Sequence, residues 1–212
     1  MYKKIIEFLK DKKIAILGFG MEGKSTYLFI RKYLSDKELT IIDKNNVMEY
    51  SKELLENDRN LDIIYGDNYL NNLEIYDIII KSPGISFKDI DTSLILDKIY
   101  SQLELLLMVN AKNVIGITGT KGKSTTSTLI YNVLKEQNKD VILAGNIGIP
   151  VLDEIENYKE DTIIVVEMSS HQLEFVAHSP HIGIILNLYE DHLDHAGSVS
   201  HYHNIKMHMF DY

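Results

Sequence analysis

The stretch from Val114 to Thr126, VIGITGTKGKSTT, constrains the fold more than any other part of this chain. An apolar β-branched run breaks into a glycine-rich segment, and Lys123 and Ser124 then lead into a helical pattern over 125–135. In such an arrangement, glycine amides surround phosphate oxygens and the helix N-terminus adds partial positive charge. The lysine reaches the β- and γ-phosphates, and the serine hydroxyl can ligate Mg²⁺. The stretch therefore predicts a nucleoside triphosphate site.

The spacing of this loop departs from the general P-loop pattern. That pattern places a glycine five residues before Gly122, where this chain has Ile117. The match is to a shorter variant, G-T-x-G-K-[ST], which runs from Gly119 to Ser124. A turn of the same composition without a ligand is the alternative, and the strand, loop and helix order favours the nucleotide.

Composition narrows the class of protein. With 212 residues, 45% hydrophobic and 25% charged, the chain can form two small cores. It has no cysteine, which excludes disulfides and cysteine-ligated zinc. A formal net charge of -9 predicts no nucleic-acid partner. The charged N-terminus lacks an apolar signal core and no apolar run approaches the span of a bilayer, so we expect a cytoplasmic protein without membrane insertion.

A second glycine loop lies near the amino terminus. The segment GFGMEGKST carries G-x-G-x-x-G directly after a strand predicted over 13–17, and the strand over 39–42 ends in Asp43. This is the layout of a dinucleotide fold, with an acidic residue placed to meet a ribose hydroxyl. The same segment, through Lys24 and Ser25, also satisfies the general P-loop spacing. We favour the Rossmann-like interpretation, since a P-loop requires neither the middle glycine nor Asp43.

Strands and helices alternate through the rest of the chain. Further strands are predicted over 62–65, 77–81, 141–144, 162–166 and 182–186, with helices over 2–9, 48–57 and 92–109. The strand over 77–81 ends in a Ser-Pro-Gly turn, at the sheet edge where open α/β folds bind ligands, although alone it would be a plain turn. The pattern predicts two α/β domains with mainly parallel sheets, over 1–110 and 111–212.

Polar residues follow the later strands. Glu167 ends the strand over 162–166, and an acidic residue in that place, downstream of a phosphate loop, holds Mg²⁺ in NTPases. Asn187 ends the strand over 182–186. All eight histidines lie at or beyond His171, and their spacing does not resemble a dedicated zinc motif, so most are predicted at the surface or in loops.

Taken together, these motifs resemble the ATP-dependent Mur ligases of peptidoglycan synthesis. Within that family they are most similar to the branch that joins D-glutamate to UDP-N-acetylmuramoyl-L-alanine. The resemblance covers almost the whole chain, through GFGMEGKS, IIDK, SPGI, GITGTKGKSTT, GNIG, VVEMSSHQLE, NLYEDHLDH and YHNIK. It implies a Rossmann-like domain at 1–110 that binds the UDP-linked substrate. At 111–212 it implies the first part of a P-loop-type central ATPase domain.

The resemblance implies a role for each motif residue. Lys123 would bind the ATP β- and γ-phosphates, Ser124 and Glu167 would hold one Mg²⁺, and His192 and Lys206 would hold a second. Lys206 would be carbamylated in the complete enzyme, because an unmodified lysine repels a metal ion. Considered without the family, Lys206 would be a solvated helix lysine.

The resemblance also implies contact residues and substrates. The ATP-binding set would be Gly119, Thr120, Lys121, Gly122, Lys123, Ser124 and Thr125. The set that holds the UDP-linked substrate would be Gly18, Phe19, Gly20, Met21, Glu22, Gly23, Asp43, Lys44, Ser82, Pro83, Gly84, Asn146 and Ser169. The catalytic residues would be Lys123, Glu167, His192 and Lys206. The γ-phosphoryl group of ATP would move to the carboxylate of UDP-N-acetylmuramoyl-L-alanine, and the amine of D-glutamate would attack the acyl phosphate.

Two residues depart from the family pattern. His171 stands where an aromatic residue is usual, and Lys121 stands where asparagine is common, but neither change removes a catalytic group. Family members continue through the rest of the central domain and a third domain that binds the amino acid. We therefore expect this chain to be a monomeric fragment that is inactive alone.

Two other functions stay open. A truncated nucleotide-binding module would bind UDP-sugar or ATP without ligating anything. An NAD-dependent oxidoreductase would fit G-x-G-x-x-G and Asp43, but it would leave the loop over 119–124 unexplained.

Overall fold

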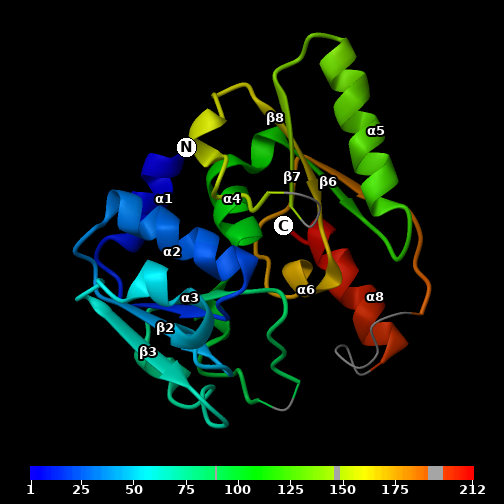
Figure 1. Ribbon diagram of the computed structural model, residues 1–212. Helices are drawn as coiled ribbons and strands as arrows, with labels where there is room; N and C mark the ends of the chain where they lie inside the picture. The colour runs from blue at the N-terminus through cyan, green and yellow to red at the C-terminus, as the bar shows by residue number, and fades with distance from the viewer. Residues whose placement is uncertain (89, 146–148, 191–197) are drawn as a thin grey trace. The chain divides into compact units, whose positions relative to one another are not determined.

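A computed structural model describes residues 1–88, 90–145, 149–190 and 198–212 of the chain (Figure 1). It divides into two compact units, one formed by residues 3–102 and the other by residues 103–212 with Met1 and Tyr2. Each unit contains its own sheet of parallel strands, so the predicted α/β class is confirmed. The functional division at residue 110 stays a prediction.

The first unit is a sheet with the strand order β3-β2-β1-β4-β5. Its strands are β1 (Ile14–Leu17), β2 (Leu39–Asp43), β3 (Leu61–Tyr65), β4 (Ile78–Lys81) and β5 (Ile99–Tyr100), and its helices are α1 (Tyr2–Leu9), α2 (Met21–Tyr33) and α3 (Met48–Leu55). Short 3₁₀ helices lie at Leu73–Ile75 and Leu96–Lys98. The order reverses between β1 and β4, and ligands bind at such a switch point in doubly wound folds.

Burial explains the apolar runs of the three central strands. Every residue of β1, β2 and β4 is buried, and parallel strands covered on both faces need near-continuous apolar runs. Helix α1 adds Ile5 and Leu9 to the core from one side of its amphipathic pattern. The sequence of the first unit therefore fits a sheet enclosed by helices.

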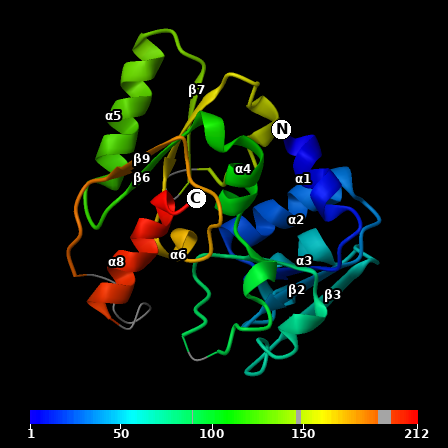
Figure 2. The same cartoon turned by 180° about the vertical axis from the view of Figure 1, so that it is seen from behind.

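The second unit is a sheet with the order β7-β8-β6-β9. Its strands are β6 (Val114–Thr118), β7 (Val141–Gly145), β8 (Ile163–Glu167) and β9 (Ile182–Ile185), and its helices are α4 (Gln102–Asn110), α5 (Lys123–Glu136), α6 (Ser170–Leu173) and α8 (Val199–Met207). Further 3₁₀ helices lie at Ala111–Asn113, Ile155–Asn157 and His208–Phe210. Helix α5 lies against β6, β7 and β8 (Figures 1 and 2).

One predicted element is wrong. The helix predicted over 92–109 is instead a 3₁₀ turn, the short strand β5 and the shorter helix α4. The apolar spacing of this segment fits a helix, but Ile99 and Tyr100 pair with Ile79 and Ile80 and extend the first sheet. Tertiary pairing therefore overrides the local helical pattern. The other predicted strands and helices form within a few residues of their expected ends.

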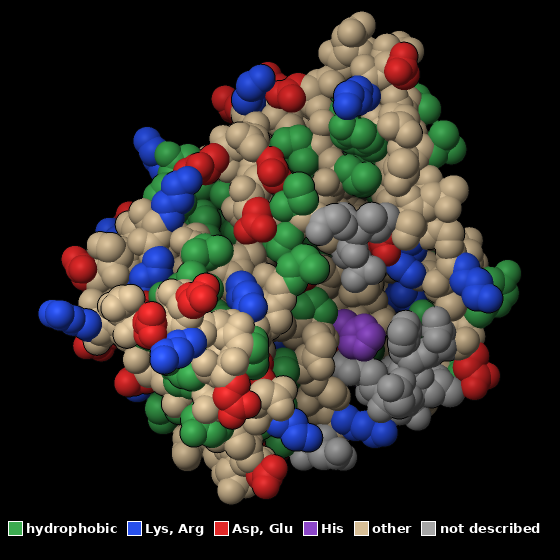
Figure 3. Space-filling view, viewed as in Figure 1, with side chains coloured by type: hydrophobic (Ala, Val, Ile, Leu, Met, Phe, Trp, Pro, Cys, Tyr) green, Lys and Arg blue, Asp and Glu red, His purple; other side chains and the backbone are tan. Residues whose placement is uncertain are grey.

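The surface of the described residues fits a charged globular chain. Acidic and basic side chains are interspersed on the face shown in Figure 3. Within the described ranges, no helix combines the length and the apolar character needed to cross a bilayer.

Candidate functional site

The glycine loop of the second unit connects the end of β6 to the start of α5. Gly119 has φ +144°, a backbone conformation that other residues rarely adopt, and an added Cβ would meet Leu186 at 3.1 Å. The Lys123 ammonium folds over the loop and donates to the carbonyls of Gly119 (3.0 Å) and Thr120 (3.1 Å). The lysine therefore lies beside the backbone that would enclose a phosphate.

The acidic strand end lies next to this loop. Strand β8 pairs with β6, and Glu167 at its end is only 2% exposed. The hydroxyl of Ser124 donates to Glu167 Oε2 at 2.9 Å. A hydroxyl and a carboxylate are hard oxygen ligands of the kind that Mg²⁺ prefers, so this pair fits a magnesium ion.

Lys206 reaches the same loop from helix α8. Its side chain is 1% exposed, and its Nζ donates to the carbonyl of Gly119 (3.1 Å) and the hydroxyl of Thr118 (3.5 Å). The ammonium lies 4.7 Å from the ring centroid of Tyr202. The interpretation of Lys206 as a solvated helix lysine is therefore wrong. These contacts suit an ammonium, which cannot ligate a metal.

Two of the predicted site residues, Asn146 and His192, lie outside the described residues. Ser169 lies at the N-terminus of α6, where its hydroxyl accepts a hydrogen bond from Gln172 N in a capping box. Among the residues that the structure describes, no three His, Asp or Glu side chains gather in a group able to hold a metal. Of the second predicted metal site, Lys206 lies among the described residues and His192 does not.

The glycine loop of the first unit follows β1 at the switch point of its sheet. Asp43 accepts hydrogen bonds from the backbone N–H of Phe19 (2.7 Å) and of Asn45 (2.8 Å). The Ser82 hydroxyl, after β4, donates to the carbonyl of Gly18 (2.9 Å). The strand ends β1, β2 and β4 thus bring the three predicted segments together.

The outer parts of this predicted site differ in exposure. Met21 is 70% exposed, and Lys44 and Gly84 are also exposed, whereas Glu22 and Pro83 are half-buried. Gly23 packs so tightly that an added Cβ would lie 2.1 Å from the carbonyl oxygen of Gly18. At Gly20, by contrast, an added Cβ would meet no atom within 4 Å.

The two serines that follow the loop lysines have different surroundings. Ser25 is 3% exposed, and its hydroxyl accepts a hydrogen bond from Gln102 Nε2 at 3.0 Å. The same amide donates to Thr26 Oγ1 (3.0 Å) and to Glu22 O (2.9 Å). Ser124 is exposed and bonded to a carboxylate instead. This contrast favours the loop at Gly119 for a triphosphate with its metal ion, and the Rossmann-like interpretation for the loop at Gly18.

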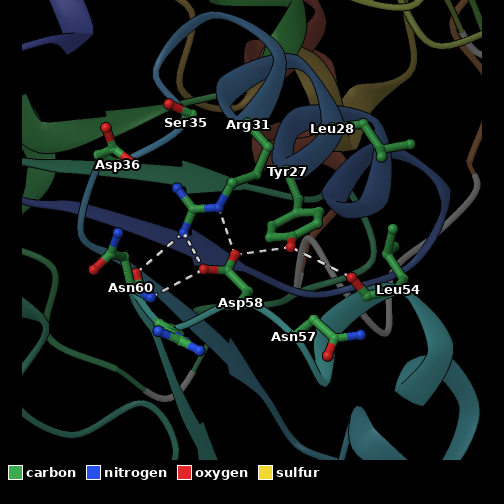
Figure 4. Close-up of a pocket in the computed structure, with 10 residues that line it drawn as sticks. Tyr27, Leu28, Arg31, Ser35, Asp36, Leu54, Asn57, Asp58 and Asn60 are labelled. Carbon is green, nitrogen blue, oxygen red and sulfur yellow. Dashed lines mark hydrogen bonds and ion pairs between the residues drawn. The ribbon is translucent and has the colours of Figure 1, made fainter.

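A depression of about 490 Å³ opens elsewhere on the first unit, beside α2, α3 and the segment that follows α3. Figure 4 shows Arg31 and Tyr27 pointing at Asp58, which forms an ion pair with Arg31 and accepts from Tyr27 OH at 2.8 Å. Burial and the contact with Asp58 raise the pKa of Tyr27 to about 12. None of the predicted site residues lines this depression, where Arg31 pairs with Asp58.

Comparison with known proteins connects these two loops to one family. The family model described as the Mur ligase middle domain matches residues 117–212. UDP-N-acetylmuramoylalanine--D-glutamate ligase of Acetivibrio thermocellus is 36% identical over 210 residues, which are 96% of this chain and 44% of that protein. The enzyme of the same name from Clostridium kluyveri is 34% identical over 97% of this chain and 45% of that protein. The chain belongs to the Mur ligase family.

This Mur ligase family chain spans less than half the length of the curated relatives that it matches. Among solved structures, UDP-N-acetylmuramate-alanine ligase MurC from Thermotoga maritima overlays with a TM-score of 0.49 and 22% identity, over 93% of this chain and 46% of that one.

Three polar residues to which the sequence motifs assign no role make specific contacts in this Mur ligase family chain. Gln102 joins three groups of α2, and Asn187 joins the phosphate loop. Glu104, 2% exposed in α4, accepts from Ala177 N (3.0 Å) and pairs with His178 Nδ1 (2.6 Å), and its burial raises its pKa. A polar residue at the end of an apolar strand was a usable signal for Asn187. For Gln102 and Glu104, the usable signal was the presence of polar residues in the otherwise apolar run QLELLLMVN.

Proposed function

We propose that this chain carries the nucleotide-binding parts of an ATP-dependent ligase that joins D-glutamate to UDP-N-acetylmuramoyl-L-alanine in peptidoglycan precursor synthesis. The first unit would hold the UDP-linked substrate, and the second would hold ATP. The reaction is inferred from the names of the relatives, and each of the two glycine loops offers a site for one nucleotide. We further propose that the chain acts in the cytoplasm as a monomer.

The observation that carries this proposal is the contact between Ser124 and Glu167 at the end of the phosphate loop. A bound Mg²⁺ would supply positive charge that offsets the charge of the transferring phosphoryl group. The Ser124 hydroxyl and the Glu167 carboxylate are the described residues that would hold this ion. Because the carboxylate is buried, it gains from a cation partner at this place.

The phosphate loop would position ATP for transfer of its γ-phosphoryl group. The N–H groups in the first turn of α5 have no partner within the helix, so they can donate to phosphate oxygens. Lys123 would leave the carbonyls of Gly119 and Thr120 and follow the charge that develops on the γ-phosphate. The acceptor is the carboxylate of the UDP-linked substrate, and the resulting acyl phosphate loses phosphate when the D-glutamate amine attacks.

Lys206 would take part only after its amine reacts with carbon dioxide. The present contacts donate from an ammonium to the Gly119 carbonyl and the Thr118 hydroxyl, and the nitrogen of a carbamate, which carries a single N–H, would keep at most one of them. We propose that carbamylation accompanies the binding of a second cation that His192 also ligates. We assign no step of the reaction to this second cation. We also propose that the 212 residues alone do not complete the ligation, since holding both reactants in line supplies much of the rate.

Lysine substitutions in the two loops test which nucleotide each unit holds. Lys123→Ala removes a cation beside the phosphates, so Mg-ATP should bind at least tenfold more weakly, or about 1.4 kcal/mol, in isothermal titration. Lys24→Ala should leave Mg-ATP binding unchanged and weaken binding of UDP-N-acetylmuramoyl-L-alanine. Each variant is the matched control for the other, because both replace the lysine of a G-K-S segment. The reverse pattern, with Mg-ATP lost at Lys24 and kept at Lys123, would overturn the assignment of both units.

A further inference from the structure

Asn187 follows strand β9 and contacts the phosphate loop from the neighbouring strand. Its Oδ1 accepts from the backbone N–H of Lys121 (2.9 Å) and of Thr120 (3.1 Å), and its Nδ2 donates to the carbonyl of Lys121 (2.9 Å). The Thr120 N–H is shared with the Asn187 carbonyl at 3.1 Å. One amide side chain therefore fixes the direction of two consecutive peptide groups of the loop.

The rest of the strand end supports the same contact. Leu186 N donates to the carbonyl of Thr118 at 3.1 Å, which continues the ladder between β6 and β9 (Figure 2). Thr120 Oγ1 accepts from Tyr189 N (2.9 Å) and donates to Tyr189 O (3.2 Å). Asn187 is thus held between two backbone contacts, and its side chain does not have to reorder to reach the loop.

These bonds divide the loop into two parts. The N–H groups of Thr120 and Lys121 point at Asn187 and are not available to an anion. The N–H groups of residues 123–125, which open α5 ahead of the helical bond from Thr126 N to the Gly122 carbonyl, remain to face the phosphates. The contacts of Asn187 therefore leave the end of the loop that leads into α5 as the end with N–H groups able to meet an anion.

An asparagine suits this position for chemical reasons. The contact needs an acceptor and a donor side by side on a short side chain, and a carboxamide supplies both. Aspartate would lack the donor for the Lys121 carbonyl and would place a negative charge beside the triphosphate. Alanine would remove both groups and let the loop amides turn.

We propose that Asn187 is a positioning residue that presets the phosphate loop for ATP, an inference that rests on the proposed function of that loop. Amide exchange tests the contact without any ligand. In Asn187→Ala the Lys121 amide should exchange at least tenfold faster by NMR, whereas the Thr120 amide should change less, because it keeps its bond to the backbone carbonyl of residue 187. The matched control is Asn113→Ala, since Asn113 also donates to backbone and side-chain oxygens, at the other end of β6. This control should leave both exchange rates unchanged.

Titration tests the consequence for binding. Asn187→Ala should weaken Mg-ATP and inorganic tripolyphosphate by the same factor, about tenfold, because only the phosphate contacts are disordered. The Asn113→Ala control should lower the melting temperature and leave both affinities within about twofold of the wild type, which separates positioning from general stability.

Each result has a distinct meaning. Unchanged protection of the Lys121 amide in Asn187→Ala overturns the inference, as does unchanged affinity. If the wild type binds neither Mg-ATP nor tripolyphosphate, the proposed function is wrong. Amide exchange would still test whether Asn187 orders the loop. If Asn187→Ala does not fold, Asn187→Asp replaces it. That variant keeps the acceptor for Lys121 N–H, so this amide should stay protected while triphosphate affinity falls at least tenfold. Retained affinity there also contradicts the inference.

Discussion

The buried carboxylate of Asp58 connects helix α2 to the segment that follows α3 in the first unit. Burial by itself would raise the pKa of Asp58, but hydrogen bonds from Arg31, Tyr27 and the Asn60 backbone outweigh it and hold the pKa below its ordinary value of 3.8. A lowered pKa stabilises the fold above the unfolded value, and this stabilisation is lost as the pH falls through the folded pKa. The network therefore contributes to acid sensitivity.

Asp58→Asn should lower the free energy of unfolding by about 2 kcal/mol near neutral pH, because it removes the charged acceptor of a half-buried arginine. The variant should also lose less stability than the wild type on acidification below about pH 4. Urea titrations at several pH values measure both effects. Asp36→Asn is the control, since Asp36 lines the same depression but is exposed. Equal acid sensitivity in wild type and Asp58→Asn would contradict the assignment.

Some contacts of single residues could be predicted from the sequence, and others could not. The contact between Ser124 and Glu167 followed from a loop pattern and a strand end, because parallel strands place their carboxyl ends at one edge. The burial of Lys206 did not follow from its own pattern, since a lysine on a helix is usually solvated. The side-chain hydrogen bonds of Gln102 and Asn187 join residues that lie far apart in the sequence, so their partners cannot be read from a local pattern.

Among the elements, the turn from β1 into α2 contains one glycine that is tightly packed and another that has open space around it. Gly23 lies against the Gly18 carbonyl, so Gly23→Ala should displace the turn and lower the melting temperature by about 10 °C. Gly20 has open space around it and an extended backbone, so Gly20→Ala should leave the melting temperature within about 2 °C. The same alanine should weaken binding of UDP, because its methyl group occupies space that a pyrophosphate would need.

Thermal melts and UDP titrations of the two variants check this pair. A Gly20→Ala protein that binds UDP normally would show that the loop does not approach the ligand closely. A Gly23→Ala protein with unchanged stability would show that the turn can relax around a methyl group.

The elements of the sheets were more predictable than the connections between them. Short β-branched runs such as the three isoleucines at 78–80 favour buried strands, and they form as expected. The helix predicted over 92–109 is wrong because the positions of Ile99 and Tyr100 fit a helical period and an edge strand equally well. Pairing with β4 decides between them, and the pairing partner is not visible in the segment itself.

For the whole molecule, the two compact units predict two separate responses to ligands. In hydrogen exchange followed by mass spectrometry, Mg-ATP should slow exchange in peptides of residues 103–212, most strongly over 119–124. UDP should slow exchange in residues 3–102, most strongly over 18–23. Lys123→Ala should abolish the first response and keep the second. Protection of the loop at 18–23 by Mg-ATP alone would contradict the division of roles.

The open space around Gly20 has a consequence for protein engineering. Because no atom of the described residues lies within 4 Å of a Cβ added there, we expect a small side chain at this position to leave the stability of the fold nearly unchanged. Gly23, one helical turn away, allows no such freedom. A designer who wishes to redirect the first unit toward a smaller anion would therefore begin at Gly20, where selectivity can change while the scaffold stays intact.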